Sequence, residues 1–437
     1  MNSILIGLSL LAAIILGRKK KINIGIAAIP FAYIVGTFFV KMLPEKVIEG
    51  WPLATFFVIL GISIFFGFAT ANGTLEVLAN NILYRFRSFP LVLPIIIFLI
   101  AVLIAALGAG YYAVMVLMAP MAIIICDKLK INPLIGALAA DCGGQVGSNF
   151  MIGLNGVVFR NLITSEGYSA DLAFSSSISI FVVYFIMTFL IILGLMFFSI
   201  HQKRAAGIDD QEEIEFALPK KYTKAQKTNL VLIAIFVVVL LLPPFAHMAF
   251  PKSSVISFMN SSINVGLVAI LFALISFLLN LSTEKEVLSK IPWGTLLMIS
   301  GMGMLVNVAI NAGTIKILSG WMNHVPSILI PLALCLLASL FNSFGGSFIG
   351  VVAPALFPVV ASIAHSTGIN PILLYTCVAI GGLATGISPF SSGGAMVLGF
   401  VKEDFRDEMY KREFYVGLPL CITVAAVTSL IYYAIMG

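Results

Sequence analysis

The sequence predicts an all-α polytopic membrane protein made of two inverted repeats, each with five spans and one re-entrant hairpin, and with broken helices at the midplane. Three observations support this: the composition, the placement of basic loops, and an internal repeat. Of 437 residues, 60% are hydrophobic and 10% are charged, whereas soluble domains carry about 25% charged residues. Apolar runs of about 20 residues recur along the whole chain, as membrane-spanning helices require.

The formal net charge of +6 and the isoelectric point near 9.0 do not indicate a nucleic-acid partner. The basic residues cluster in short loops, which is typical of the cytoplasmic loops of membrane proteins. The five cysteines lie in or beside apolar segments and form no CxxC pattern. We therefore expect neither disulfides nor a metal site.

The first repeat spans residues 1–200. It begins with an uncleaved span, because the basic residues 18–21 follow the apolar run instead of preceding it, and this places the N-terminus outside. The following elements are span 2 (about 22–43), span 3 (about 52–83), a hairpin with "LGAG" at its tip (about 89–126), a broken span 4 (about 131–159) and span 5 (about 171–200).

Residues 201–226 form the longest polar stretch and are rich in Lys and Arg, which predicts a cytoplasmic linker. The second repeat, 227–437, has the same plan. Its elements are span 6 (about 228–250), span 7 (262–280), span 8 (292–312), a hairpin with "FGGS" at its tip (about 326–364), a broken span 9 (about 371–399) and span 10 (414–436). An odd number of crossings per half gives the halves opposite orientations and places the C-terminus outside.

The repeat is also visible in the residues. "WPLATFFVILGISIFFGFATANGTLEVL" at 51–78 aligns with "IPWGTLLMISGMGMLVNVAINAGTIKIL" at 291–318 without a gap. "INP" occurs at 131–133 and 369–371, and a Gly-Gly pair follows each copy. An inverted repeat with matched Gly-rich interruptions is typical of secondary transporters, whose site lies near the midplane between the repeats.

The two interruptions are "GGQVGSNFMIGLNG" (143–156) and "GGLATGISPFSSGGA" (381–395). A lipid-facing helix cannot break, because each unpaired backbone group in hydrocarbon costs several kcal/mol. Breaks that line a wet cavity would present helix N-termini to an anion and carbonyl oxygens to a cation. The alternative is that the glycines only allow close helix packing. For paired sets at matched positions we favour the functional interpretation.

The order of hairpin tip, apolar run, "INP", "GG" and Ser/Pro-rich break resembles the ion transporter superfamily, which includes divalent anion/sodium symporters. "FFGFATANGTLEVLA" and "GISPFSSGGA" are most similar to the malonate/dicarboxylate carriers of the MatC type. The resemblance covers essentially the whole chain. It implies a carrier in a bacterial-type cytoplasmic membrane that moves a small dicarboxylate (malonate, succinate or malate) by alternating access. It also implies coupling to Na⁺ or H⁺, no cofactor, and a homodimer.

The resemblance and the breaks together suggest where the substrate binds. The candidate substrate-binding residues lie at the hairpin tips and the breaks: Gly108, Ala109, Gly110, Ser148, Asn149, Asn155, Asn342, Ser343, Gly345, Gly346, Ser347, Ser388, Ser391 and Ser392. Neither tip keeps the Ser-Asn-Thr pattern of the symporters, so we expect backbone carbonyls to replace side chains at any sodium site. Candidates for the coupling ion are Asp141, Gly144 and Gly382. Asp141 lies at membrane depth, where an acid is either functional or a hydrogen-bonded structural group.

Other functions remain open. A carrier of the same fold could take citrate or another organic anion, export arsenite, or exchange a cation for protons. The sequence shows no cluster of intramembrane acids, which argues against a cation as cargo. An intramembrane enzyme would need buried His/Asp constellations, and an ATP-driven pump would need a P-loop; the sequence contains neither. The expected partners are thus a small organic anion, a coupling cation and the lipid bilayer.

Overall fold

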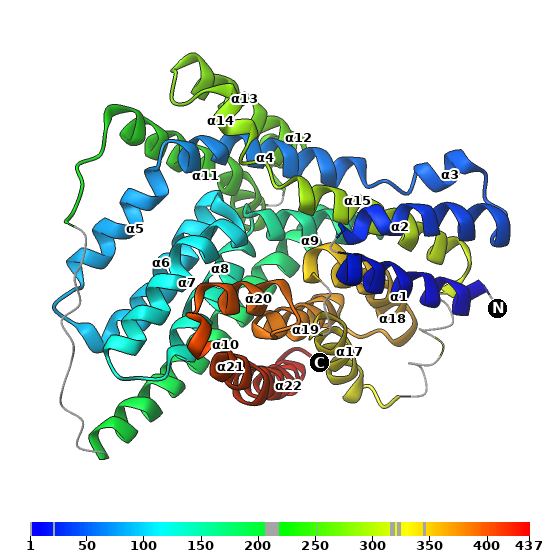
Figure 1. Cartoon of the computed structure of the whole chain (residues 1–437). Coiled ribbons are helices and arrows are strands. Elements are labelled where there is room, and N and C mark those ends of the chain that lie inside the picture. The colour runs from blue at the N-terminus through cyan, green and yellow to red at the C-terminus, as the bar shows by residue number, and fades with distance from the viewer. Residues whose placement is uncertain are drawn as a thin grey trace.

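The chain folds into helices that pack against one another in one body (Figure 1). The computed structural model describes residues 2–20, 22–205, 218–250, 252–314, 320, 325–343 and 347–437, and every regular element in those ranges is helical. The first half contains α1 (Asn2–Lys20), α2 (Ile24–Tyr33), η1 (Ile34–Phe39), α3 (Pro44–Ile48), α4 (Leu53–Ala71), α5 (Thr74–Arg85), η2 (Pro90–Val92), α6 (Leu93–Ile104), η3 (Ala105–Ala109), α7 (Gly110–Lys128), α8 (Pro133–Ser148), α9 (Leu154–Ser165) and α10 (Ala170–Ala205).

The second half has a similar series. It contains α11 (Lys224–Ala249), α12 (Ser254–Ser262), α13 (Val265–Leu278), α14 (Glu284–Leu288), α15 (Trp293–Asn311), α17 (Leu329–Ser343), η4 (Phe348–Val352), α18 (Ala353–Thr367), α19 (Pro371–Ala384), η5 (Thr385–Ile387), α20 (Ser392–Phe400), α21 (Glu403–Arg412), η6 (Glu413–Gly417) and α22 (Leu418–Met436). Across the described ranges, eight segments are long and apolar enough to span a membrane, or nine if the bent pair α12–α13 is one span. The prediction of an all-α, multi-pass membrane protein is confirmed.

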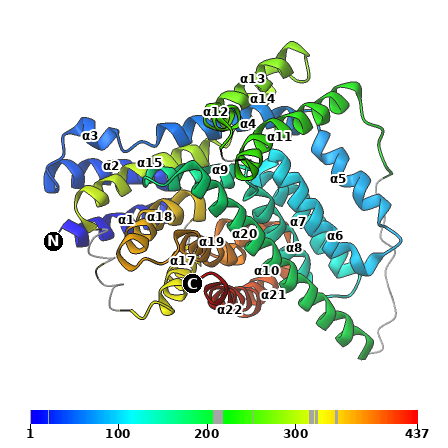
Figure 2. The same cartoon turned by 180° about the vertical axis from the view of Figure 1, so that it is seen from behind.

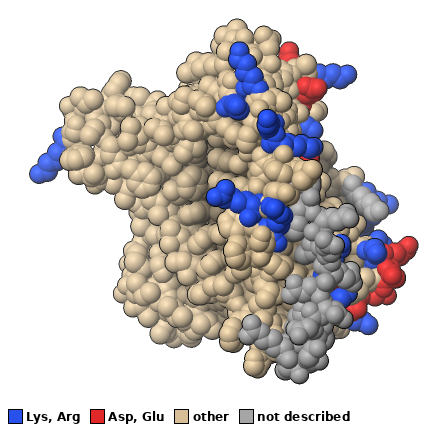
Figure 3. Space-filling model, turned by 90° about the vertical axis from the view of Figure 1, so that its left-hand side faces the viewer, with Lys and Arg blue, Asp and Glu red and all other residues tan. Residues whose placement is uncertain are grey.

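The surface fits a lipid environment. On the face shown in Figure 3, most Lys, Arg, Asp and Glu lie from the centre to the right, a few basic side chains lie at the left edge, and a broad area at the lower left carries no charge. Large apolar side chains are exposed on several long helices, among them Phe197 of α10 and Leu278 of α13. In water such a surface would be an aggregation hazard, whereas lipid tails accommodate it.

Elements at matched sequence positions have matched bounds. α4 and α15 are both 19 residues long, and each follows a proline, Pro52 or Pro292. α8 and α19 each begin at the proline of an "INP" motif, and the preceding asparagine, Asn132 or Asn370, accepts a hydrogen bond from a backbone N–H of the first turn. An Asn cap followed by proline at the first helical position is a strong start signal, which explains why both helices begin there. The opposite orientation of the two halves stays a prediction.

Each half also contains a hairpin ahead of its broken helix. In the first, α6 and α7 meet at η3, where Gly108 has φ +89° and Gly110 has φ +73°. A Cβ at Gly108 would overlap the ring of Phe66 on α4, so the tip requires glycine for two reasons. In the second, α17 and η4–α18 form the arms. The predicted tip residues Gly345 and Gly346 lie outside the described residues.

The Gly-Gly pairs bring each broken helix against its hairpin. A Cβ at Gly143 would lie 2.6 Å from the carbonyl oxygen of Phe98 on α6. At the matched position on α19, a Cβ at Gly381 would overlap the carbonyl of Cys335 on α17. Small residues thus allow backbone-to-backbone packing at both places. α10 crosses the back of the molecule (Figure 2) and packs against α8, α9 and α19, so it braces both broken helices.

Candidate functional site

Each half of the chain contains one break, and the second break packs against the helix that precedes the first. The first lies between α8 and α9, and the second between η5 and α20. A Cβ placed on Gly393, at the start of α20, would lie 2.7 Å from Oδ1 of Asp141 on α8. One on Gly386 would lie 3.1 Å from Oδ2 of the same carboxylate. The residues on either side of the second break, in η5 and α20, therefore pack against Asp141 in the middle of α8, about 240 residues away in sequence.

Asp141 is held from two sides. Its side chain is 1% exposed. The hydroxyl of Tyr111, in the first turn of α7, donates to Oδ1 at 2.5 Å, and Nε2 of Gln145, one turn along α8, donates to Oδ2 at 2.9 Å. Tyr111 and Gln145 also line a cavity, so this hydrogen-bonded trio connects the buried acid to open space.

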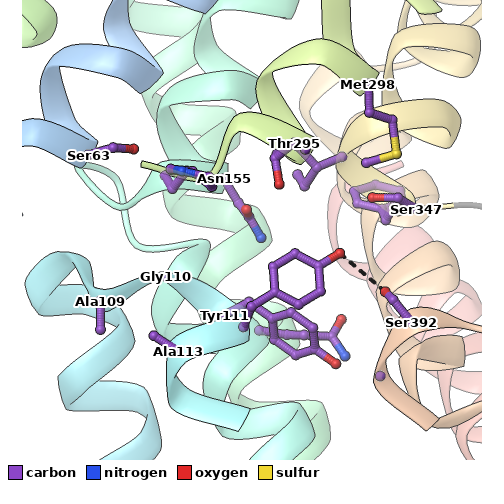
Figure 4. A pocket seen from close by; sticks show the side chains of 18 of the residues that line it. Ser63, Ala109, Gly110, Tyr111, Ala113, Asn155, Thr295, Met298, Ser347 and Ser392 are labelled. Carbon is purple, nitrogen blue, oxygen red and sulfur yellow. Dashed lines mark hydrogen bonds between the residues drawn. The ribbon is translucent and has the colours of Figure 1, made fainter. Parts of the chain in front are cut away.

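The cavity has a volume of about 580 Å³. Figure 4 shows side chains converging on it from several elements: Ala109 and Ala113 from the first hairpin, Asn155 from α9, Thr295 and Met298 from α15, and Ser347 and Ser392 from the second half. Eight of the candidate residues contribute to the lining: Gly108, Ala109, Gly110, Asn155, Asn342, Ser347, Ser391 and Ser392. Both hairpins and both breaks therefore face the same space.

Residues at six helix N-termini line this cavity. They belong to α2, α7, α9, α15, η4 and α20, whose first-turn or capping residues Asn23, Gly110, Asn155, Thr295, Ser347 and Ser392 all line it. The first N–H groups of a helix lack intrahelical partners and carry a partial positive charge, and such ends bind anions. Lys290, exposed at the same cavity, adds a full positive charge. The electrostatics of the cavity favour an anion.

The polar groups of the lining differ in their availability. Nδ2 of Asn155 donates to Oδ1 of Asn149 at 3.0 Å, which fixes the Asn155 amide at the start of α9. The hydroxyl of Ser391 donates to the carbonyl of Ser388 and accepts from the N–H of Gly394, so Ser391 caps α20. Ser392 is exposed to the cavity, and its hydroxyl lies 3.3 Å from that of Tyr112. Ser392 is therefore the most available hydroxyl of the second break.

Four candidates lie beneath the lining instead of in it: Ser148, Asn149, Ser343 and Ser388, all at most 5% exposed. Ser388 donates to the carbonyl of Ser343 at 2.8 Å, which ties the second break to the end of α17. Asn149 supports Asn155 as described above. These residues support the cavity lining and do not face the cavity themselves.

The two coupling-ion candidates besides Asp141 are also packed. A Cβ on Gly144 would lie 3.3 Å from the ring of Tyr111, and one on Gly382 would overlap the ring of Phe348. The carbonyl of Gly382 already accepts from Nδ2 of Asn342 at 2.7 Å. Both glycines let their hairpins approach closely.

Sequence reasoning missed several lining residues. Tyr111 and Tyr112 directly follow the "LGAG" tip, and Thr295 belongs to the aligned repeat segments, so a signal existed for these three. Gln145 could have been found one helical turn after Asp141. Lys290 lies just before α15 and carried no signal that separates it from an ordinary loop lysine.

A second buried acid was also missed. Glu413 begins η6, is fully buried, and neither of its carboxylate oxygens has a hydrogen-bond partner among the residues the structure describes. It lies close enough to Asp141 for the two to interact electrostatically. An ionised carboxylate without a partner in such a place costs several kcal/mol, so we expect Glu413 to be protonated. In the described ranges no three His, Cys, Asp or Glu side chains gather as a metal site would require.

The fold and the site define a class: a multi-pass carrier with a central cavity shared by two broken helices and two hairpins. The family model of the dicarboxylate carrier protein MatC N-terminus matches residues 1–148 and 228–386. The chain belongs to this family. It is thus a transporter and not an enzyme.

Solved structures show the same fold. The YdaH transporter of Alcanivorax borkumensis is similar with a TM-score of 0.58 and 18% identity, over 90% of this chain and 85% of that chain. MtrF of Neisseria gonorrhoeae, described with a class of antimetabolite efflux pumps, is similar with a TM-score of 0.59 and 16% identity, over 90% of this chain and 83% of that chain. A comparison with curated protein sequences finds no match. At these identities the two structural likenesses concern the fold alone.

Proposed function

We propose that the protein is a secondary active carrier of a small dicarboxylate of the malonate, succinate or malate class, working by alternating access. The observation that carries this proposal is the convergence of six helix N-termini and Lys290 on one cavity. Such ends hold an oxyanion through backbone N–H groups without a fixed counter-charge. A site of that kind can release its cargo again, as a carrier must.

The residues facing the cavity suggest how a dicarboxylate is held. Ser392 and the first turn of α20 would receive one carboxylate. Asn155 and the first turn of α9 would receive the other, from the opposite half. Each carboxylate then contacts a different half of the chain, so relative movement of the halves changes both contacts together.

We propose that a cation drives transport, and the buried acids favour the proton. Asp141 of α8 lies against the residues on either side of the second break and reaches the cavity through Tyr111 and Gln145. Glu413 provides a second protonatable group near it. Intramembrane acids of this kind mark proton relays in many transporters. We also propose that the protein forms a homodimer, and this part of the proposal rests on the family resemblance alone.

Transport by purified protein in proteoliposomes tests the proposal. Labelled malonate, succinate and citrate are offered under an imposed proton gradient, an imposed sodium gradient, or neither. We expect saturable accumulation of malonate or succinate that a proton gradient drives. If none of the three anions is transported, the dicarboxylate assignment is refuted. If accumulation requires the sodium gradient and the proton gradient has no effect, the proposal of proton coupling is refuted.

A further inference from the structure

A second polar cavity lies between α9, α10 and α11–α13. Its volume is about 170 Å³, and its polar lining consists of Arg160, Asn161, Thr164, Asp171, Asn260 and Asn264. It shares no lining residue with the central cavity. α9 nevertheless connects the two, because Asn155 lines the central cavity and Arg160 follows five residues later, about 7.5 Å along the helix.

Arg160 has no counter-ion in the part of the chain that the structure describes. Its Nε is buried and lacks a hydrogen-bond partner, as does Nδ2 of the neighbouring Asn161. The acid of the same cavity, Asp171, is engaged elsewhere: its Oδ1 lies 3.3 Å from Nδ1 of His247 and accepts from Nδ2 of Asn260 at 3.4 Å. The guanidinium carbon of Arg160 lies 5.6 Å from the centre of the Phe174 ring.

Arg160 is partly exposed, and the buried part of its guanidinium, Nε, is the part that lacks a partner. A buried donor without a partner costs about 1–3 kcal/mol, and a guanidinium does not lose its proton readily, so a bound anion would offset this cost. Its planar fork matches the two oxygens of a carboxylate and forms two parallel hydrogen bonds with them. The unpaired amide of Asn161 offers a further donor beside it. Arg160 and Asn161 thus offer unpaired donors to one oxyanion, on the side of the cavity formed by α9.

We propose that this cavity is a second anion site, in which Arg160 and Asn161 hold an oxyanion apart from the central cavity. The volume of the cavity suits a small carboxylate. The position of Arg160 on α9 places this site about one and a half helical turns from the central cavity. That the bound carboxylate is also the transported substrate rests on the proposed function; the anion site itself does not. A lipid phosphate has the same chemistry, so the experiment must separate the two sources.

Binding of succinate to the purified full-length protein in nanodiscs tests the site. In phosphatidylcholine discs we expect calorimetry to resolve two binding events. Arg160→Gln should remove one event or weaken it at least tenfold, and Arg160→Lys should weaken it less, because the charge stays and the fork is lost. Asn155→Ala should affect only the other event, so failure of the central site and failure of this one are distinguishable.

Two further arms complete the test. Asn161→Leu keeps Arg160 but fills part of the cavity, and should weaken the same event if Arg160→Gln fails to fold. Adding phosphatidylglycerol to the discs should leave the Arg160-dependent event unchanged if the anion is a free carboxylate. If instead only phosphatidylglycerol stabilises the wild type against heat, and does so through Arg160, the oxyanion is a lipid phosphate. If neither succinate nor phosphatidylglycerol binding depends on Arg160, the proposal is overturned.

Discussion

Ser391 and Ser392 are adjacent in the sequence, yet the structure gives them different tasks. Ser392 is exposed at the central cavity, where its hydroxyl accepts a hydrogen bond from that of Tyr112 at 3.3 Å. Ser391 is buried and caps α20 through bonds to the chain itself. Replacing each by alanine removes the same hydroxyl from the two environments, so each variant is a matched control for the other.

The two variants should differ in what they change. A hydrogen bond to a charged group contributes about 1.5–3 kcal/mol, and about 1.4 kcal/mol corresponds to tenfold in affinity. Ser392→Ala should therefore raise the half-saturating concentration for uptake about ten- to hundredfold and leave the melting temperature unchanged. Ser391→Ala removes a helix cap worth about 0.5–2 kcal/mol, so it should lower the melting temperature.

Uptake of labelled succinate into proteoliposomes gives the kinetics, and thermal unfolding in detergent gives the stability. Reconstituted amounts must be equal for the comparison to hold. If Ser392→Ala has wild-type kinetics, the hydroxyl does not contact the substrate and the proposed arrangement at α20 is wrong. If Ser391→Ala changes kinetics alone, the capping role is wrong.

The remaining predictions concern the packing of the second break, the coupling and the topology. Gly386→Ala should slow uptake, since its Cβ would overlap Nε2 of Gln145 and push that side chain away from Asp141. Gly399→Ala, with nothing within 4 Å of its Cβ, should transport normally, and equal uptake by both variants would contradict the packing of the second break against α8. Asp141→Asn should stop gradient-driven accumulation of substrate while exchange of substrate across the membrane persists. If the mutant still responds to the gradient, Asp141 has only a structural role. Single cysteines in 201–226 should resist an impermeant thiol reagent in intact cells, because the basic residues predict a cytoplasmic linker; labelling there would refute the inverted repeat.

Much of the fold could be predicted because it depends on local signals. "INP" carries both a cap and a helix start, and α8 and α19 begin at its proline. The 240-residue offset relates α4 to α15 residue by residue. Glycines at the "LGAG" tip adopt the positive φ that a turn requires. Each of these depends on a few neighbouring residues, which a sequence displays directly.

The site was harder to predict because it depends on the crossing of distant segments. Ser388 and Ser391 belong to a polar stretch that looks uniform in sequence, but one bonds to the end of α17 and the other caps α20. Glu413 lies in a charged stretch that reads as solvated, yet it is buried near Asp141. Packing between helices far apart in the chain decides which serine faces the cavity and which acid is buried away from water.

The central claim is that the cavity shared by the two breaks holds the substrate. Ala113, in the first turn of α7, lines this cavity without being a proposed ligand, and the five native cysteines are buried, so a small thiol reagent should report on Ala113→Cys alone. Saturating succinate should slow its modification at least tenfold and leave Ser165→Cys, exposed at the end of α9, unaffected. If succinate saturates uptake by Ala113→Cys while the modification rate stays the same, the substrate binds elsewhere and the account is contradicted.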